Sequence, residues 1–225
     1  MGRDHYPLVP AAAGLGFGRG TMMLEDCEGA NNWLVTSTDD AGTGTFEAAA
    51  AYQGAYGLQI KTREAGAATD DYCQAMRMLS YPESGLLVVR LRLSYPKLTP
   101  DFQFQLQVDV ASNTATYRGE LRITSTTAAQ EYLNSGGTYT SLGSPNDELY
   151  PQGWYEVELV LDVAAMTYLE AMVNGWRVDL SDQALRDLSS SEQRQVQLSL
   201  IVTALTDAST YVYLDNVYVG EYLGA

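Results

Sequence analysis

Residues 102–110 read FQFQLQVDV, with a large apolar residue at every second position. Successive side chains of a β-strand point to opposite faces of its sheet, so this stretch has one apolar face and one polar face. The same period of two recurs in residues 155–163, YEVELVLDV, and in residues 196–202, VQLSLIV. These three stretches predict core strands of a sheet that is buried on one side and wet on the other.

Further ranges have strand character, and turn residues separate them. Asn174-Gly175 divides two of these ranges and is typical of a two-residue hairpin turn. Residues 182–194 alone indicate a helix, with Ser181 as its N-cap. Many strands at short spacing with almost no helix predict an all-β antiparallel jelly-roll β-sandwich with one short helix. The additional strands are expected at residues 22–28, 55–62, 72–79, 86–95, 116–124, 167–173, 176–179 and 210–219.

The chain has 225 residues, which one large β-sandwich domain can fill. Residues 1–20 differ from the rest, because their prolines and alternating glycines leave no periodic apolar face. We expect this segment to be an extended N-terminal arm, either frayed or ordered against a partner subunit. Residues 21–225 are expected to form a single sandwich domain. The expected anchors of the arm are Leu8, Val9, Leu15 and Phe17.

Thirteen basic residues against 28 acidic residues give a net charge of −15 at pH 7. Nucleic-acid binding needs clustered positive charge, so we expect no nucleic-acid partner, and the acidic surface also argues against a membrane partner. No basic segment followed by an apolar one opens the sequence, which argues against classical secretion. Cys27 and Cys73 lack the paired spacing of a zinc site, which leaves buried free thiols or one disulfide.

Three patches of sequence together resemble the concanavalin A-like lectin/glucanase jelly-roll superfamily and its related carbohydrate-binding modules. The patches are residues 24–29 with Trp33 downstream, residues 153–175, and residues 213–220. In that superfamily a Trp that opens a strand, an Asp at its end and an Asn-Gly hairpin recur together. The resemblance implies the sandwich fold, which serves lectins, glycosidases, receptor domains and virus particle proteins.

The resemblance is incomplete where the superfamily's glycosidases carry their catalytic carboxylates on a Glu-x-Asp-x-(x)-Glu strand. Glu156 and Glu158 share one strand face, but the third carboxylate is missing, so a glycoside hydrolase is a remote alternative. The single histidine, His5, lies in the expected arm, which leaves no partner for a Ser-His or Cys-His nucleophile. We therefore expect the protein not to be an enzyme.

The resemblance also implies a candidate structural calcium ion. Several carbohydrate-binding jelly rolls hold calcium between acids of the first strand and an Asp of the last, and on that pattern Glu25, Asp26 and Asp215 would supply oxygen ligands. We expect the first and last strands to pair, which brings these acids close together. The alternative is that Asp215 caps a bend while the other two acids face water. No cofactor is expected to be required.

Sugar binding on such a fold needs an aromatic platform together with amide and carboxylate hydrogen-bonding groups. The outward positions of two consecutive expected strands carry a polar row, but we place no aromatic residue on that face. The candidates for stacking are Trp33, Trp154 and Trp176, and Trp154, which opens the strand at residues 155–163, is the one added to the row. A polar row also suits a solvated sheet face or a wet subunit interface. Its residues are Gln103, Gln105, Gln107, Arg118, Glu120 and Arg122.

Sixteen tyrosines against four phenylalanines favour extensive interfaces, because tyrosine buries area while keeping a hydroxyl for a partner. Together with the arm, this favours a structural or adhesive subunit of a larger assembly. We expect a phage virion surface protein, either for capsid decoration or associated with the tail, that assembles in the host cytoplasm. Its expected partners are copies of itself in a homo-oligomer and a capsid or tail protein. The alternative is an extracellular carbohydrate-binding module or lectin-like domain that recognises a polysaccharide on the polar face.

Overall fold

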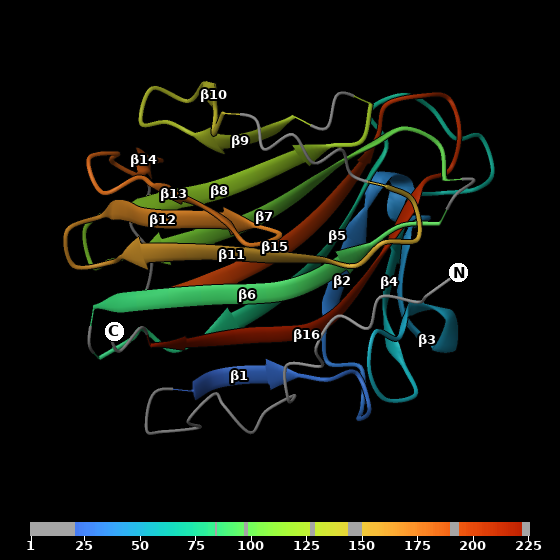
Figure 1. Ribbon diagram of the computed structural model, residues 1–225, viewed down its shortest axis with the longest axis horizontal. Coiled ribbons are helices and arrows are strands. Elements are labelled where there is room, and N and C mark those ends of the chain that lie inside the picture. Colours follow the sequence, from blue (N-terminus) through green and yellow to red (C-terminus); the bar gives the residue numbers. More distant parts are fainter. Residues whose placement is uncertain are drawn as a thin grey trace, which may run out of the picture.

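The computed structural model describes residues 21–83, 85–96, 99–126, 129–143, 150–189 and 194–221. These residues form two antiparallel sheets that lie against each other as two layers (Figure 1). The predicted antiparallel sandwich is confirmed. The expected arm at residues 1–20, with its four anchor residues, lies outside the described residues. No helix in the described ranges is long and apolar enough to cross a membrane.

One layer, sheet A, holds the first and last strands of the described chain. Its strands are β1 (Thr21–Glu25), β3 (Thr43–Glu47), β4 (Gly57–Lys61), β6 (Leu86–Ser94), β11 (Tyr155–Asp162), β12 (Thr167–Val173), β13 (Trp176–Asp179) and β16 (Tyr211–Glu221). Their order is β13-β12-β11-β6-β16-β4-β3, and β1 also pairs with β16.

The second layer, sheet B, holds the longest uninterrupted pairing. Its strands are β2 (Leu34–Ser37), β5 (Tyr72–Leu79), β7 (Phe102–Ala111), β8 (Thr116–Thr124), β9 (Gln130–Leu133), β10 (Tyr139–Ser141), β14 (Arg186–Asp187) and β15 (Gln195–Ala204). Their order is β10-β9-β8-β7-β15-β5-β2, and β14 pairs with β8. Two short 3-10 turns, η1 (Thr38–Asp40) and η2 (Ala48–Ala50), connect the early strands.

The core lies between the sheets and is built from the alternating positions of β7, β11 and β15. Full burial of one such aliphatic or aromatic side chain contributes about 1.5–3 kcal/mol. Cys27 and Cys73 are also buried and both are free thiols. Burial raises the pKa of Cys73 to about 11. The fully buried core side chains of the three strands include Phe104, Leu106, Val108, Val157, Leu159, Leu161, Leu198, Leu200 and Val202.

The helix predicted at residues 182–194 is wrong over its described part. Ala184 forms an antiparallel bridge with Thr167, and β14 adds to the edge of β8. A helix this short gains little from its own hydrogen bonds, whereas the β8 edge offers ready partners for its backbone. Leu185 is buried among the core residues. Residues 190–193 lie outside the described part of the chain.

The two ends of the described chain pair as expected, which places β1 beside β16 (Figure 1). β4 pairs with β16 at residues 211–214, and β1 pairs with it at residues 217–220. The pairing of β16 with β6 shifts register between Asp215 and Tyr218, and Asn216 has a φ of 50°. β4 and β1 therefore share one edge of β16, with an irregularity between them.

The hairpin at Asn174-Gly175 is confirmed, because it joins β12 to β13 and both residues have positive φ, 51° and 84°. A two-residue turn of this kind needs left-handed backbone at both positions. Besides β14, which was assigned to the helix, four strands escaped the sequence analysis, namely β2, β3, β9 and β10. They have four, five, four and three residues, too few to show a clear period of two.

Gly57 is a sharp test of how β4 packs. A Cβ atom added at Gly57 would lie 1.9 Å from the carbonyl oxygen of Ala50, which is fully buried. We expect Gly57→Ala to lower the free energy of unfolding by about 3 kcal/mol, measured by urea denaturation. Gly29→Ala is the matched control because nothing lies within 4 Å of its added Cβ atom. Equal stability of the two variants would contradict this packing.

Candidate functional site

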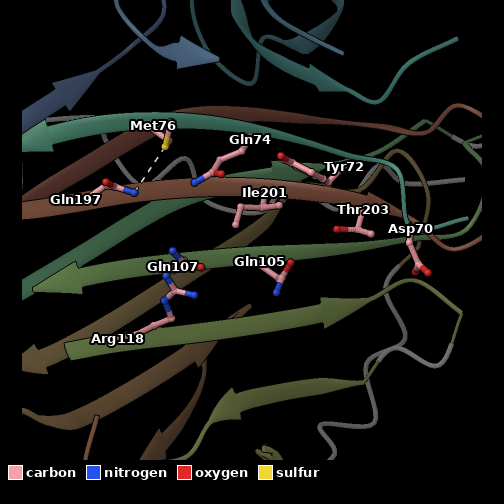
Figure 2. Close-up of a pocket in the computed structure, with 10 residues that line it drawn as sticks. All are labelled: Asp70, Tyr72, Gln74, Met76, Gln105, Gln107, Arg118, Gln197, Ile201 and Thr203. Atoms are coloured by element: carbon pink, nitrogen blue, oxygen red, sulfur yellow. Dashed lines mark hydrogen bonds between the residues drawn. The ribbon is translucent and has the colours of Figure 1, made fainter. Parts of the chain in front are cut away.

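A groove with a volume of about 500 Å³ opens on the outer face of sheet B (Figure 2). This volume lies in the range of small-ligand sites, roughly 300–1,000 Å³. Strand β15 runs along its centre, with β5 on one side and β7 and β8 on the other (Figure 2). The residues that line the groove are Asp70, Tyr72, Gln74, Met76, Gln105, Gln107, Arg118, Gln197, Ile201 and Thr203.

The register of four strands brings these side chains together. Gln105 lies opposite Ile201 on β15 and opposite Arg122 on β8. Ile201 in turn lies opposite Gln74 on β5. Outward residues of neighbouring strands stand side by side, so these positions form one row across the sheet. The row that follows contains Met76, Ser199, Gln107 and Glu120.

A polar network borders the groove where β7, β8 and β10 meet. The side-chain nitrogen of Gln105 donates to the Glu120 carboxylate at 2.6 Å and to the Tyr139 hydroxyl oxygen at 3.0 Å. The Tyr139 hydroxyl also donates to Glu120, whose residue is only 2% exposed. Burial, followed by the hydrogen bond to Glu120, raises the pKa of Tyr139 to about 12. The phenol therefore keeps its proton at neutral pH and acts as a donor to the buried carboxylate.

Two arginines beside this network are paired with carboxylates of neighbouring strands. Arg118 binds both oxygens of Asp109, at 2.7 and 2.9 Å. Arg122 binds Glu131 through Nε at 2.8 Å, and its guanidinium lies 3.3 Å from the centre of the Tyr139 ring. Bidentate pairing and aromatic stacking hold guanidinium groups in fixed orientations. The positive charge at this face is therefore balanced within the protein.

The six residues of the polar row predicted from the sequence share one face of sheet B, but only three of them line the groove. Gln105, Gln107 and Arg118 line it, while Glu120 and Arg122 belong to the adjoining network. Gln103 lies on the same face opposite Thr203 and does not line the groove. The lining from β5 and β15 was missed, although both strands were predicted and their alternation would have identified the outward residues.

The expectation that no aromatic residue shares this face is wrong. Tyr72, at the start of β5, is 39% exposed and lines the groove, and Tyr139 of β10 borders the network. The sequence does not show which strands pair with β5 and β10, so the positions of Tyr72 and Tyr139 on this face could not be predicted. Trp154, by contrast, precedes β11 of sheet A and packs edge-on against Tyr52 with ring centres 5.3 Å apart. It is therefore not part of the row to which the sequence analysis added it.

The other candidate carboxylates, Glu156 and Glu158, lie on the outer face of sheet A and are bound by arginines. Glu156 pairs with Arg92 at 3.0 Å, and Glu158 pairs with Arg90 and, at 3.1 Å, with Arg177. Glu158 is 1% exposed, so its carboxylate faces these guanidinium groups rather than a cleft. These carboxylates serve as links of an ion-pair ladder that joins β6, β11 and β13.

Internal donors engage all three acids implied as calcium ligands, and Asp26 accepts from the backbone nitrogen of Glu28 at 3.2 Å. Asp215 accepts hydrogen bonds from the backbone nitrogens of Tyr52 and Gln53 at 2.8 and 2.9 Å. Glu25 accepts from the backbone nitrogen of Cys27 and pairs with Arg77 at 2.8 Å. Within the described ranges, no three His, Cys, Asp or Glu side chains form a group that could hold a metal. Calcium also takes backbone carbonyl oxygens as ligands, so the calcium site that the resemblance implies stays a prediction.

Comparison with solved structures finds this sandwich in proteins that act on or bind polysaccharides. The endo-β-1,4-glucuronan lyase from the fungus Trichoderma reesei has a TM-score of 0.57, with 13% identity over 85% of this chain and 92% of that chain. Alginate lyase vAL-1 from Chlorella virus has a TM-score of 0.53, with 9% identity over 90% of this chain and 100% of that chain. The chain has the concanavalin A-like jelly-roll fold.

A family 11 carbohydrate-binding module from Clostridium thermocellum, in complex with a β-1,3-1,4-mixed-linked tetrasaccharide, has a TM-score of 0.49. It shares 13% identity over 92% of this chain and 98% of that chain. No protein-family model and no curated protein sequence matches the chain. Because identities this low show the fold alone, the function must be argued from the residues of the groove.

Calcium removal tests the account given of Glu25, Asp26 and Asp215. Because internal donors satisfy the carboxylates of Glu25 and Asp215, we expect the thermal melting temperature to be the same in excess CaCl₂ and in excess EDTA. Differential scanning calorimetry of the full chain measures it. A melting temperature that falls on chelation and recovers with calcium would restore the calcium site that the resemblance implies.

Proposed function

We propose that the protein is a non-catalytic carbohydrate-binding module that holds a polysaccharide chain in the groove of sheet B. The observation that carries this proposal is the combination of side-chain amides and an exposed tyrosine around one open hollow. Gln74, Gln105 and Gln107 offer amide groups from two strands, and Tyr72 offers a ring at one end. Amides bond sugar hydroxyls in the plane of the ring, while an aromatic face contacts the apolar C–H face of the sugar.

Preorganisation supports this use of the groove. The side chains of Gln105 and Gln107 are held by hydrogen bonds to Glu120 and Asp109, so they lose little rotational freedom when a ligand binds. The fold supports the proposal as well, because similar structures include enzymes whose names give glucuronan and alginate as substrates. Both substrates are polysaccharides, which agrees with a glycan as the ligand.

The chemistry of the groove favours binding over catalysis. Elimination at a uronic acid needs a base to take a proton and a cation to stabilise the carboxylate of the substrate. The pKa of Tyr139 is raised to about 12, mainly by burial, so its phenolate is unavailable as a base at neutral pH. Arg118 and Arg122 are already paired with Asp109 and Glu131. For hydrolysis, the pair Glu156 and Glu158 lies on the other sheet within ion pairs.

The virion interpretation stays a prediction. It rests on residues 1–20, which lie outside the described residues, and on tyrosine content. A glycan-binding groove is compatible with an adhesive subunit of a particle, so the two interpretations do not exclude each other. The predicted homo-oligomer, the capsid or tail partner and the place of assembly stay predictions on the same ground.

Gln105→Ala tests the groove as the glycan site. Removing this amide from the centre of the row should weaken binding of a soluble polysaccharide by about tenfold, as expected for the loss of one or two hydrogen bonds to a ligand. Affinity gel electrophoresis over a panel of polysaccharides measures the change, and circular dichroism checks the fold. Gln59→Ala, a matched change on β4 of sheet A, should leave binding unchanged.

Equal losses in both variants would place the ligand elsewhere or indicate a general effect on stability. Trp154→Ala gives a second comparison, because Trp154 lies beside Tyr52 at sheet A. Binding lost with Trp154→Ala and kept with Gln105→Ala would contradict the groove of sheet B and move the site to that aromatic pair.

A further inference from the structure

We infer that the groove selects uncharged, hydroxyl-rich glycan chains and rejects polyuronates, because its glutamines present carbonyl oxygens and its arginines are neutralised. This inference rests on the proposed function and specifies the ligand class of the same site. It separates this protein from the two lyases of similar fold, whose names give polyuronate substrates.

The orientation of two side-chain amides follows from the chemistry of their partners. The nitrogen of Gln105 faces the Glu120 carboxylate, and the nitrogen of Gln107 faces the Asp109 carboxylate at 3.2 Å. A carboxylate at neutral pH accepts hydrogen bonds and donates none, so only the NH₂ end of each amide can face it. The amide oxygen of each glutamine must therefore point the other way.

The carbonyl oxygens of these glutamines are left for a ligand. Figure 2 shows the amide oxygen of Gln105 on the side of β15 and its nitrogen on the side of β8. The nitrogen of Gln197 likewise faces the Met76 sulfur at 3.6 Å, which can only accept, and it donates to the Ser199 hydroxyl at 3.1 Å. Across the described part of the chain, no hydrogen-bond donor reaches the carbonyl oxygens of Gln105, Gln107 and Gln197. Gln107 is only 5% exposed, so the acceptors that face a ligand are chiefly the carbonyl oxygens of Gln105 and Gln197. These acceptors suit a ligand that donates hydrogen bonds from hydroxyl groups.

The charges around the groove exclude an anionic chain. Arg118 and Arg122 are outnumbered by the carboxylates of Asp109, Glu120 and Glu131 in the same network. Asp70 adds a further acid at the end near Tyr72 (Figure 2). A uronate carboxylate entering here would meet carbonyl oxygens and like charges without a free cation. Juxtaposed like charges of this kind weaken a complex, and the chain as a whole carries a net charge of −15.

One further cation lies nearby without entering the groove. Arg186 of β14 stands opposite Arg118 in register, but its guanidinium lies against Gly137, between β9 and β10. It is not among the lining residues. In register, Arg186 lies on the far side of Arg118 from Asp109 and the groove. The Asp109 carboxylate is therefore nearer to the groove than the Arg186 guanidinium, and the groove stays negatively charged.

The test uses matched pairs of soluble oligosaccharides that share a linkage and differ only at C6, such as β-1,4-linked glucose and glucuronic acid oligomers. Isothermal titration calorimetry of the full chain identifies the linkage that binds. For that linkage, the neutral oligomer should bind at least about tenfold more tightly than the uronate oligomer. Raising the salt concentration should leave the neutral affinity unchanged, because that binding involves no ion pair.

Variants then test the cause. Asp109→Asn and Glu131→Gln each release an arginine, so each should raise the affinity for the uronate member several-fold. Glu47→Gln removes the same charge from β3 of sheet A and should leave both affinities unchanged. Absence of any gain in the first two variants would contradict the role of the neutralised arginines.

The outcomes separate the two proposals. Preferential binding of the uronate member by the unmodified chain would overturn this inference while leaving the groove as a glycan site. Failure of a broad panel of neutral and anionic glycans to bind at all would overturn the proposed function itself.

Discussion

The pairing of β7 with β15 is the contact on which both the core and the groove depend. It runs without interruption from Ala111 opposite Gln195 to Phe102 opposite Ala204. Side chains alternate along a strand, so one register puts Phe104 inside and Gln105 outside. A slip of one residue would exchange these faces, burying a row of amides and exposing the aromatic core. The apolar side of the pairing thus fixes which polar groups stand in the groove.

Beneath the polar surface of sheet B lies a buried carboxylate that needs partners. Glu120 is almost fully covered, and an unpaired charge in that position would be strongly destabilising. Tyr139 and Gln105 satisfy it, and in doing so they lose the freedom to turn towards solvent. The electrostatic requirement of one buried group is therefore what orients the amide that a ligand would meet. If the groove binds a glycan as proposed, the same hydrogen bonds serve both stability and recognition.

Long stretches in which apolar and polar residues alternate were predicted as strands from the sequence alone. β7, β8, β11 and β15 were predicted, and the outward row on β7 and β8 followed directly from their alternation. The groove and its bordering network could not be completed in the same way, because Tyr72 reaches the groove through the pairing of β5 with β15, and Tyr139 reaches the network through the pairing of β10 with β9. The pairing of β5 with β15 joins residues far apart in the chain, and β9 and β10 are too short to show a clear period of two. The helix expected after Ser181 failed for the same reason, since the edge of β8 decided the local structure.

The shared edge of β16 gives the sandwich a direction of mechanical weakness. Thr21, where β1 begins, lies opposite Gly220 near the end of β16. Thr21 and Gly220 lie at the same end of the antiparallel pair, so a force that pulls them apart acts on the last pair of the ladder first. The hydrogen bonds between β1 and β16 would then break in sequence rather than all at once. Sheet B, with its ten-residue ladder, lies in the other layer and away from that line of force. The Glu25–Arg77 ion pair ties β1 to β5 of sheet B, so a load that peels β1 away also breaks this link between the two layers.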